Sequence, residues 1–276
     1  MVLNEGHQVA VVQMVSGADL QQNLQQAAGW IAKATAAGSQ LIVLPENFAV
    51  FNAAELLGRG IDELTLEGPI RRFLAEQAKQ HSVWIVAGSI PVVSEDGKRV
   101  RSACIVVDEQ GVEQARYDKI HLFDVDVSDS QGSYRESDQI EPGDSVVLVD
   151  TPVGRLGLTI CYDLRFPLLY QKLVEQGAEL ISVPAAFTYA TGEAHWQTLL
   201  QARAIETQCY LLAANQGGVH NERRQTYGHS MIIDPWGELL GCHSTGEGLV
   251  QAEIQLSRVQ QVRKNMPLLA HRRLLD

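Results

Sequence analysis

Cysteine is scarce in this sequence, and its four cysteines lie tens of residues apart. No C-x-x-C pair occurs, and the spacing lacks the density of a disulfide framework. We therefore expect reduced thiols. Cys104, Cys209 and Cys242 have strand-like or core-like neighbours, which predicts buried, unreactive side chains. Cys161 instead directly follows a predicted strand, at residues 154–160.

The sequence also lacks segments that insert into a membrane. Residues 1–7 contain no basic stretch followed by an apolar core, as a signal peptide would. Apolar runs such as residues 41–44 are far shorter than the ~20 residues that a membrane helix needs. The expectation is a soluble, cytoplasmic protein with no membrane partner.

Positive charge is in deficit, because 22 Lys and Arg residues face 33 Asp and Glu residues and the net charge is −11. No basic cluster reverses this balance locally. Such a chain repels polyanions, which argues against binding to nucleic acid or to an anionic membrane. A small molecule is the expected partner.

Several catalytic motifs are absent, namely G-x-S-x-G, H-E-x-x-H, G-x-x-x-x-G-K-[ST] and G-x-G-x-x-G. The eight histidines are scattered, and none pairs with a cysteine at a zinc-ligand spacing. We therefore predict no metal site.

What the sequence does contain is a long alternation of strand and helix patterns. With 276 residues and 45% hydrophobic content, the chain is long enough to bury a large core, and we expect one domain over residues 1–276. Residues 8–14, 41–44 and 83–88 read as strands, and apolar residues at helical spacing lie between them. Residues 102–107 and 113–117 read as a hairpin, so the sheet is expected to be mixed.

The second half repeats this alternation. Strands are predicted at residues 146–149, 154–160, 179–183 and 210–214, helices at 167–176 and 192–207, and a hairpin turn at 234–237. The polar stretch 124–144 shows neither the strand nor the helix periodicity of apolar residues, and it is either a functional loop or a flexible one. Two α/β halves, each burying a sheet, predict α/β layers in the order helix, sheet, sheet, helix.

Three reactive side chains follow predicted strands, where α/β proteins collect their sites. They are Glu46, Lys119 and Cys161. A cysteine nucleophile needs a nearby positive charge or base, because a free thiol is only slightly ionised at neutral pH. Lys119 would supply the charge and Glu46 the base. Each residue alone has an ordinary alternative, such as a turn cap or a solvated lysine.

Three sequence blocks resemble the signatures of the nitrilase, or carbon-nitrogen hydrolase, superfamily. They are Leu-Pro-Glu-Asn-Phe at 44–48, Tyr-Asp-Lys-Ile-His-Leu-Phe-Asp at 117–124 and Thr-Ile-Cys-Tyr-Asp-Leu-Arg-Phe-Pro at 159–167. The resemblance covers nearly the whole chain. It implies a four-layer α-β-β-α sandwich of the nitrilase type with mixed sheets, a homodimer or larger homo-oligomer, and no cofactor.

The resemblance also implies roles for the matching residues. Cys161 would be the nucleophile, Glu46 the general base and then acid, and Lys119 the oxyanion donor together with the backbone N–H of Tyr162. Glu136 matches the position of a second glutamate in the family. An ordinary solvated acid remains the alternative reading, because Glu141 lies close by.

The blocks at 184–187, 191–196, 202–210 and 227–231 look most like the deaminated glutathione amidase branch, whose substrate is an amide that carries carboxylates. Arg165 would bind one of these carboxylates through its guanidinium, and Thr191 and Phe187 are further candidates for substrate binding. For Arg165 a salt bridge to Asp163 or another acid stays open. His195 is expected to pack on its helix.

Two other functions remain open at this point. The neighbouring omega-amidase branch would release ammonia from 2-oxoglutaramate or 2-oxosuccinamate, and it shares the acyl half of the substrate. A binding, scaffold or redox-sensing protein with this fold would be expected to have lost a member of the triad. All three members are present.

Overall fold

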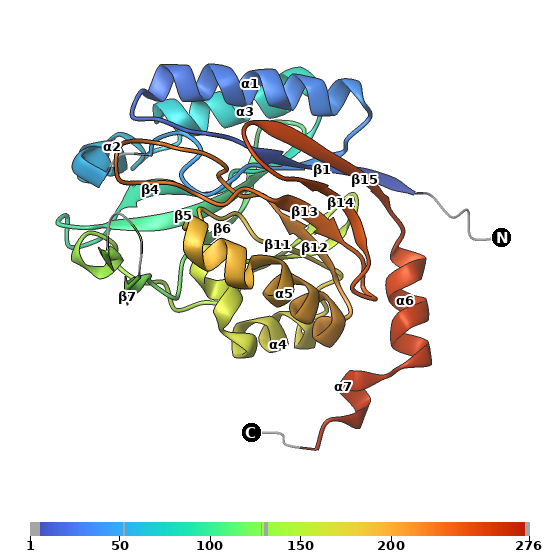
Figure 1. The fold of residues 1–276 in the computed structure, drawn as a ribbon. Helices are drawn as coiled ribbons and strands as arrows, with labels where there is room; N and C mark the ends of the chain where they lie inside the picture. The colour runs from blue at the N-terminus through green and yellow to red at the C-terminus, as the bar shows by residue number, and fades with distance from the viewer. Residues whose placement is uncertain (1–5, 52, 128, 130–131, 274–276) are drawn as a thin grey trace.

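Two mixed β-sheets form the centre of the computed structural model, which describes residues 6–51, 53–127, 129 and 132–273. The sheets pack face to face, and helices cover the outer face of each (Figure 1). The layers therefore follow the order α-β-β-α, and the predicted four-layer sandwich is confirmed.

The first sheet has seven strands. Its order is β15 (Gly248–Ile254), β1 (His7–Gln13), β2 (Leu41–Val43), β3 (Trp84–Val86), β5 (Val100–Val107) and β4 (Ile90–Val93), and β6 (Glu113–Asp118) also pairs with β5. Strands β1, β2 and β3 run parallel, whereas the other pairs are antiparallel. The β5–β6 hairpin is the one that the sequence predicts.

The second sheet has six strands. Its order is β14 (Leu239–His243), β13 (Ser230–Ile233), β12 (Tyr210–Ala213), β11 (Leu180–Ser182), β10 (Gly154–Leu158) and β9 (Leu148–Thr151). Again the central strands, β10, β11 and β12, are parallel and the flanking pairs are antiparallel. In each sheet a parallel strand leads to a candidate catalytic residue: β2 is followed by Glu46, and β10 is followed by Cys161.

Helices α1 (Leu20–Ala36) and α3 (Pro69–His81) cover the first sheet, and α4 (Pro167–Glu175) and α5 (Tyr189–Thr207) cover the second (Figure 1). The short helix α2 (Leu56–Asp62) contacts β4. Helices α6 (Leu256–Asn265) and α7 (Leu268–His271) follow β15. Asp19 begins α1, because its carboxylate accepts a hydrogen bond from the Gln22 N–H at 2.9 Å.

Alternate residues of the strands point to different layers of the core. On β1, Val9 and Val11 face the second sheet, whereas Ala10 and Val12 face α1 and α3. All four are fully buried, so this strand reads as a continuous apolar run rather than as an alternation. The two cores fix the separation of the layers.

The polar stretch 124–144 is only partly irregular. It contains the strands β7 (Asp124–Asp126) and β8 (Ser133–Arg135), which form a two-stranded sheet, and a turn of 3₁₀ helix at Glu136–Asp138.

The prediction of a buried thiol is wrong for Cys242, whose residue is exposed on the edge strand β14. Among the described residues, no helix combines the length and apolar character that a membrane span requires.

Candidate active site

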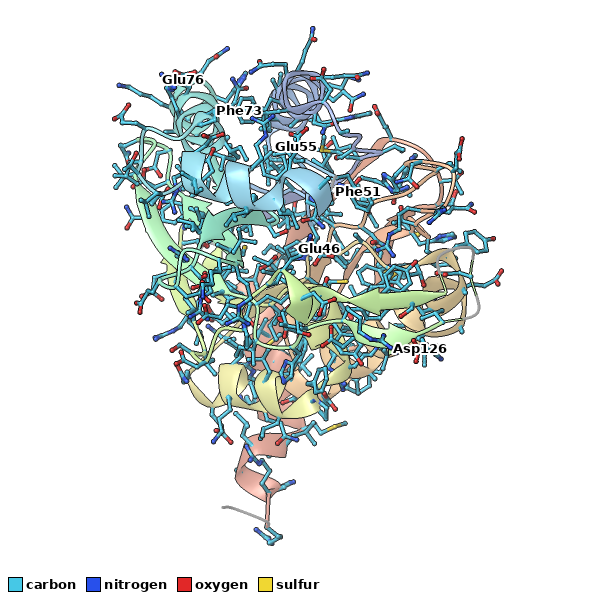
Figure 2. All side chains as sticks on the ribbon, turned by 90° about the vertical axis from the view of Figure 1, so that its left-hand side faces the viewer. Glu46, Phe51, Glu55, Phe73, Glu76 and Asp126 are labelled. Carbon is cyan, nitrogen blue, oxygen red and sulfur yellow. The ribbon has the colours of Figure 1, made fainter. Side chains whose placement is uncertain are left out.

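Glu46 follows β2, near the middle of the molecule (Figure 2). Only 4% of the residue is exposed. The segment packs on Gly88, which has a φ of +63°, a conformation that favours glycine. A Cβ at this position would also collide with the carbonyl oxygen of Pro45. Ser89 accepts a hydrogen bond from the Asn47 N–H at 3.0 Å. These contacts fix the carboxylate within the core.

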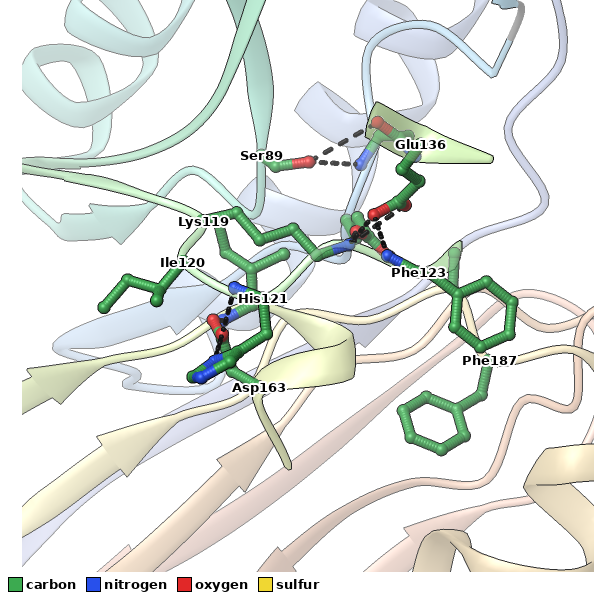
Figure 3. Close-up of polar contacts among 12 residues, drawn as sticks. Ser89, Lys119, Ile120, His121, Phe123, Glu136, Asp163 and Phe187 are labelled. Atoms are coloured by element: carbon green, nitrogen blue, oxygen red, sulfur yellow. Dashed lines mark hydrogen bonds and ion pairs between the residues drawn. The ribbon is translucent and has the colours of Figure 1, made fainter. Parts of the chain in front are cut away.

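Lys119 follows β6 and is almost completely buried. Its Nζ donates to Glu46 Oε1 at 2.9 Å and to the two carboxylate oxygens of Glu136 at 3.0 and 2.8 Å (Figure 3). An isolated ammonium at this depth would be costly, so the two carboxylates are what make its burial possible.

Glu136 is the second glutamate of this cluster. Its Oε2 also accepts a hydrogen bond from the Phe123 N–H at 2.8 Å. The β7–β8 hairpin leads directly into this position. Glu141 instead pairs with Arg101 at 2.6 Å, on the other side of the turn. The structure therefore places Glu136, and not Glu141, in contact with Lys119.

Cys161 begins a short 3₁₀ helix, Cys161–Arg165, after β10. Its φ is +48°, a left-handed conformation that non-glycine residues rarely adopt and that tends to occur at functional sites. The Cys161 N–H donates to the carbonyl of Pro184 at 2.8 Å. The thiol lines the same pocket as Glu46 and Glu136, so the structure brings the sequence-predicted residues together.

The electrostatics of the pocket keep the lysine charged and the thiol protonated. Burial opposes a charge on Lys119, but Glu136 and Glu46 outweigh burial and raise its pKa well above the usual value. Burial and the nearby Glu46 raise the pKa of Cys161, although Lys119 and the Ala186 N–H act in the opposite direction. In the resting site the sulfur is therefore a thiol that has a carboxylate next to it.

A second buried carboxylate, Asp163, organises the loops around the site. It accepts hydrogen bonds from the Tyr117 hydroxyl at 2.7 Å and the Ile160 N–H at 2.9 Å, and its Oδ1 lies 2.7 Å from Nδ1 of His121 (Figure 3). Asp163 was not among the residues that the sequence predicts to form the site. Its sequence signal was an acid two residues after the candidate nucleophile Cys161, within a block that matches the family.

The remaining predicted residues lie on the wall of the pocket. The lining comprises Glu46, Asn47, Phe123, Glu136, Cys161, Tyr162, Arg165, Ala186, Phe187, Thr188, Thr191 and Arg224. Arg165 does not pair with Asp163. Its guanidinium lies 5.3 Å from the centre of the Phe187 ring, and Nη1 lies 3.3 Å from Nδ1 of His195. His195 is exposed, so the expectation that it packs on its helix is wrong.

Arg224 and Asn47 are pocket residues that the sequence analysis missed. Arg224 belongs to a polar loop, and no periodicity distinguishes it from its exposed neighbour Arg223. The fold alone reveals which of the two arginines faces the site.

Comparison with known proteins identifies the family. The sequence profile of the carbon-nitrogen hydrolase family matches residues 8–264. The chain is 46% identical over 270 residues to the deaminated glutathione amidase of Yersinia enterocolitica, which covers 97% of this chain and 93% of that protein. It is 39% identical over 274 residues to the human deaminated glutathione amidase, covering 96% of this chain and 82% of that protein.

Solved structures agree with this assignment. The NitFhit protein of Caenorhabditis elegans superposes with a TM-score of 0.89 at 40% identity, over 97% of this chain. This chain spans 65% of the NitFhit chain. Saccharomyces cerevisiae Nit3, a member of branch 10 of the nitrilase superfamily, superposes with a TM-score of 0.87 at 29% identity over 99% of both chains. The chain therefore belongs to the carbon-nitrogen hydrolase family of the nitrilase superfamily and is a hydrolase of carbon-nitrogen bonds other than peptide bonds.

Proposed function

We propose that this chain hydrolyses the amide bond of deaminated glutathione, releasing 2-oxoglutarate and cysteinylglycine through a thioester on Cys161. The observation that carries the proposal is the Lys119 ammonium, buried between Glu46 and Glu136, which line the same pocket as Cys161. The substrate class comes from the relatives at 39–46% identity that are named deaminated glutathione amidase.

In acylation, Glu46 takes the proton of the Cys161 thiol as the sulfur attacks the amide carbonyl. The raised pKa of the thiol makes this proton transfer necessary, because little thiolate is present beforehand. Lys119 and the backbone N–H of Tyr162 stabilise the negative charge on the carbonyl oxygen. Glu46 then gives its proton to the departing amine.

In deacylation, Glu46 accepts a proton from a water molecule that attacks the thioester, and it returns this proton to the Cys161 sulfur as 2-oxoglutarate leaves. Lys119 again stabilises the negative charge, and its raised pKa keeps it an ammonium throughout. The role of Glu136 is to hold the ammonium in position, because both of its oxygens bind Nζ while one also accepts the Phe123 N–H. In this mechanism Lys119 keeps its positive charge throughout, whereas Glu46 gains and loses a proton.

The acyl half of the substrate carries a carboxylate next to its keto group. Arg165 is the proposed partner of that carboxylate, since its guanidinium lines the pocket and is not paired with an acid among the described residues. Phe187 forms an apolar wall beneath it, and Thr191 adds a hydroxyl to the lining.

The proposal includes a single catalytic domain over residues 1–276 that acts in the cytoplasm as a homodimer or larger homo-oligomer. The apolar residues Ile205, Trp236 and Leu239 are 51%, 56% and 40% exposed, and Ile205 lies against Gly237, the residue after Trp236. Burial of such side chains against a second copy would stabilise a dimer. Sedimentation at several concentrations tests the assembly.

The omega-amidase alternative is not favoured, because several relatives at 40–46% identity over nearly the whole chain are named deaminated glutathione amidase. The test is a direct comparison of kcat/KM for deaminated glutathione and for 2-oxoglutaramate. We expect a higher value for deaminated glutathione, with release of 2-oxoglutarate. A higher value for 2-oxoglutaramate, with release of ammonia, would contradict the proposed substrate.

A further inference from the structure

A wider cavity adjoins the catalytic pocket. Its volume is about 510 Å³, and it shares Asn47, Glu136 and Arg224 with the pocket that contains Cys161. Phe51, which lines it, lies on the side of the molecule that Figure 2 faces. The cavity is large enough for a substrate portion that the chemistry at Cys161 does not touch.

The substrate's leaving group must extend toward this cavity. Glu46 protonates the departing amine, so the amine lies beside its carboxylate. Asn47, the next residue, lines both the pocket and the cavity. The cavity wall includes the apolar residues Val50, Leu56 and Ile140, which suit a small uncharged side chain.

Arg224 lines both the catalytic pocket and the wider cavity, and one of its hydrogen-bond donors has no partner among the described residues. Its Nη2 donates to the Ala186 carbonyl at 2.9 Å, and its guanidinium lies 4.7 Å from the centre of the Tyr134 ring. Its Nη1 is buried and has no hydrogen-bond partner among the described residues. None of the ion pairs within the described part of the chain involves Arg224. A buried donor of a charged group without a partner is costly, which indicates an anionic ligand.

The loop that carries Arg224 is held in place before substrate arrives. The His220 N–H donates to the Arg224 carbonyl at 2.9 Å, and the Arg224 N–H donates to the Asn221 side chain at 2.9 Å. The His220 ring stacks on Phe51 with 3.9 Å between ring centres and binds the Ser16 carbonyl at 2.7 Å. The guanidinium is therefore preorganised rather than mobile.

We propose that Arg224 binds the terminal carboxylate of the leaving cysteinylglycine, and that the wider cavity is the leaving-group subsite. This inference rests on the proposed function. Arg165 and Arg224 then hold the substrate at its two charged ends while Cys161 attacks the amide between them. A substrate whose leaving group is ammonia gains nothing from Arg224, so this residue determines specificity within the family's shared chemistry.

The test compares deaminated glutathione with the same compound whose terminal carboxylate is converted to an amide. The wild-type protein should favour the acid by about 10- to 100-fold in kcat/KM, the range expected for a hydrogen-bonded charge. In Arg224→Gln that ratio should fall to about 1, since the neutral side chain cannot distinguish the two ends. Arg224→Lys should retain part of the preference.

Arg223→Gln is the matched control, because Arg223 is exposed and lines neither space. It should keep the wild-type ratio. An Arg224→Gln variant that loses the same factor on both compounds would reveal a purely structural role and overturn the inference, as would a wild-type protein that turns over acid and amide equally. Wild-type protein that hydrolyses neither compound would contradict the proposed function instead.

Discussion

The hydroxyl of Tyr117 donates a 2.7 Å hydrogen bond to Asp163, and both side chains are buried. Tyr117 lies two residues before Lys119, on the first sheet, and Asp163 lies two residues after Cys161, beyond the second sheet. This bond therefore ties together the two loops that carry the ammonium and the thiol.

Asp163→Asn should destabilise the protein by about 2–4 kcal/mol, because the amide cannot accept all the hydrogen bonds that the buried carboxylate receives. Urea unfolding measures the loss. The exposed Asp150, which faces Arg155 across 3.8 Å, is the control, and Asp150→Asn should leave the unfolding midpoint unchanged. Equal midpoints for the two variants would contradict this role of Asp163.

Glu136→Gln should lower kcat/KM by about 100-fold, the scale of losing one electrostatic contribution to the transition state. The amide no longer attracts the Lys119 ammonium, so the oxyanion donor is less firmly positioned. Steady-state kinetics with deaminated glutathione measure this loss. Glu141→Gln, on the same loop but paired with Arg101, should stay within about twofold of wild type. The assignment fails if the Glu141 variant loses more activity than the Glu136 variant.

Alkylation of Cys161 by iodoacetamide should accelerate as the pH rises above about 8.5, the ordinary pKa of a free thiol. Burial and Glu46 raise the pKa of Cys161, so the reactive thiolate forms only at higher pH. Mass spectrometry of the Cys161 peptide follows the reaction, and exposed Cys242 serves as the internal reference. A rate at Cys161 that is already constant between pH 6 and 8 would indicate a preformed thiolate.

His220 should make stability depend on pH between 6.5 and 4. Burial lowers its pKa from 6.5 to about 4, so the unfolded chain takes up this proton at a higher pH than the folded protein does. The stabilisation is fully present above pH 6.5 and is lost as the pH falls to about 4, a loss of up to about 3 kcal/mol. The free energy of unfolding in urea, measured from pH 7 to 4, reports it.

His220→Gln isolates this contribution from those of the many carboxylates that titrate in the same range. Its stability should decline less steeply with falling pH than that of the wild type. The matched change at exposed His271 should reproduce the wild-type slope. Parallel slopes for wild type and the His220 variant would contradict the assignment.

The fold was largely predictable because its core elements have strong apolar patterns. The run at residues 41–44 and the helical spacing of Leu20, Leu24, Ala27 and Ile31 both lie in the cores that the structure shows. The β7–β8 hairpin was not predictable, because its short strands are polar and only partly buried. Its stability comes from contacts such as the 2.8 Å hydrogen bond between Tyr134 and Asp129.

Residues of the candidate site could be proposed from the sequence where they follow strands or match family blocks, as for Glu46, Lys119, Cys161 and Glu136. Arg224 could not, because its position depends on a loop conformation that contacts of His220 with Phe51 and Ser16, two residues far away in the sequence, hold in place. Local sequence carries no signal of such an arrangement.

The most direct test of the mechanism is to trap the acyl-enzyme. Wild-type protein is mixed with deaminated glutathione, quenched in acid within the first turnovers and digested for mass spectrometry. The peptide that contains Cys161 should carry one 2-oxoglutaryl group, and Cys161→Ala should yield neither this adduct nor 2-oxoglutarate. An acyl group on another residue, or 2-oxoglutarate formed by Cys161→Ala at the wild-type rate, would contradict the account.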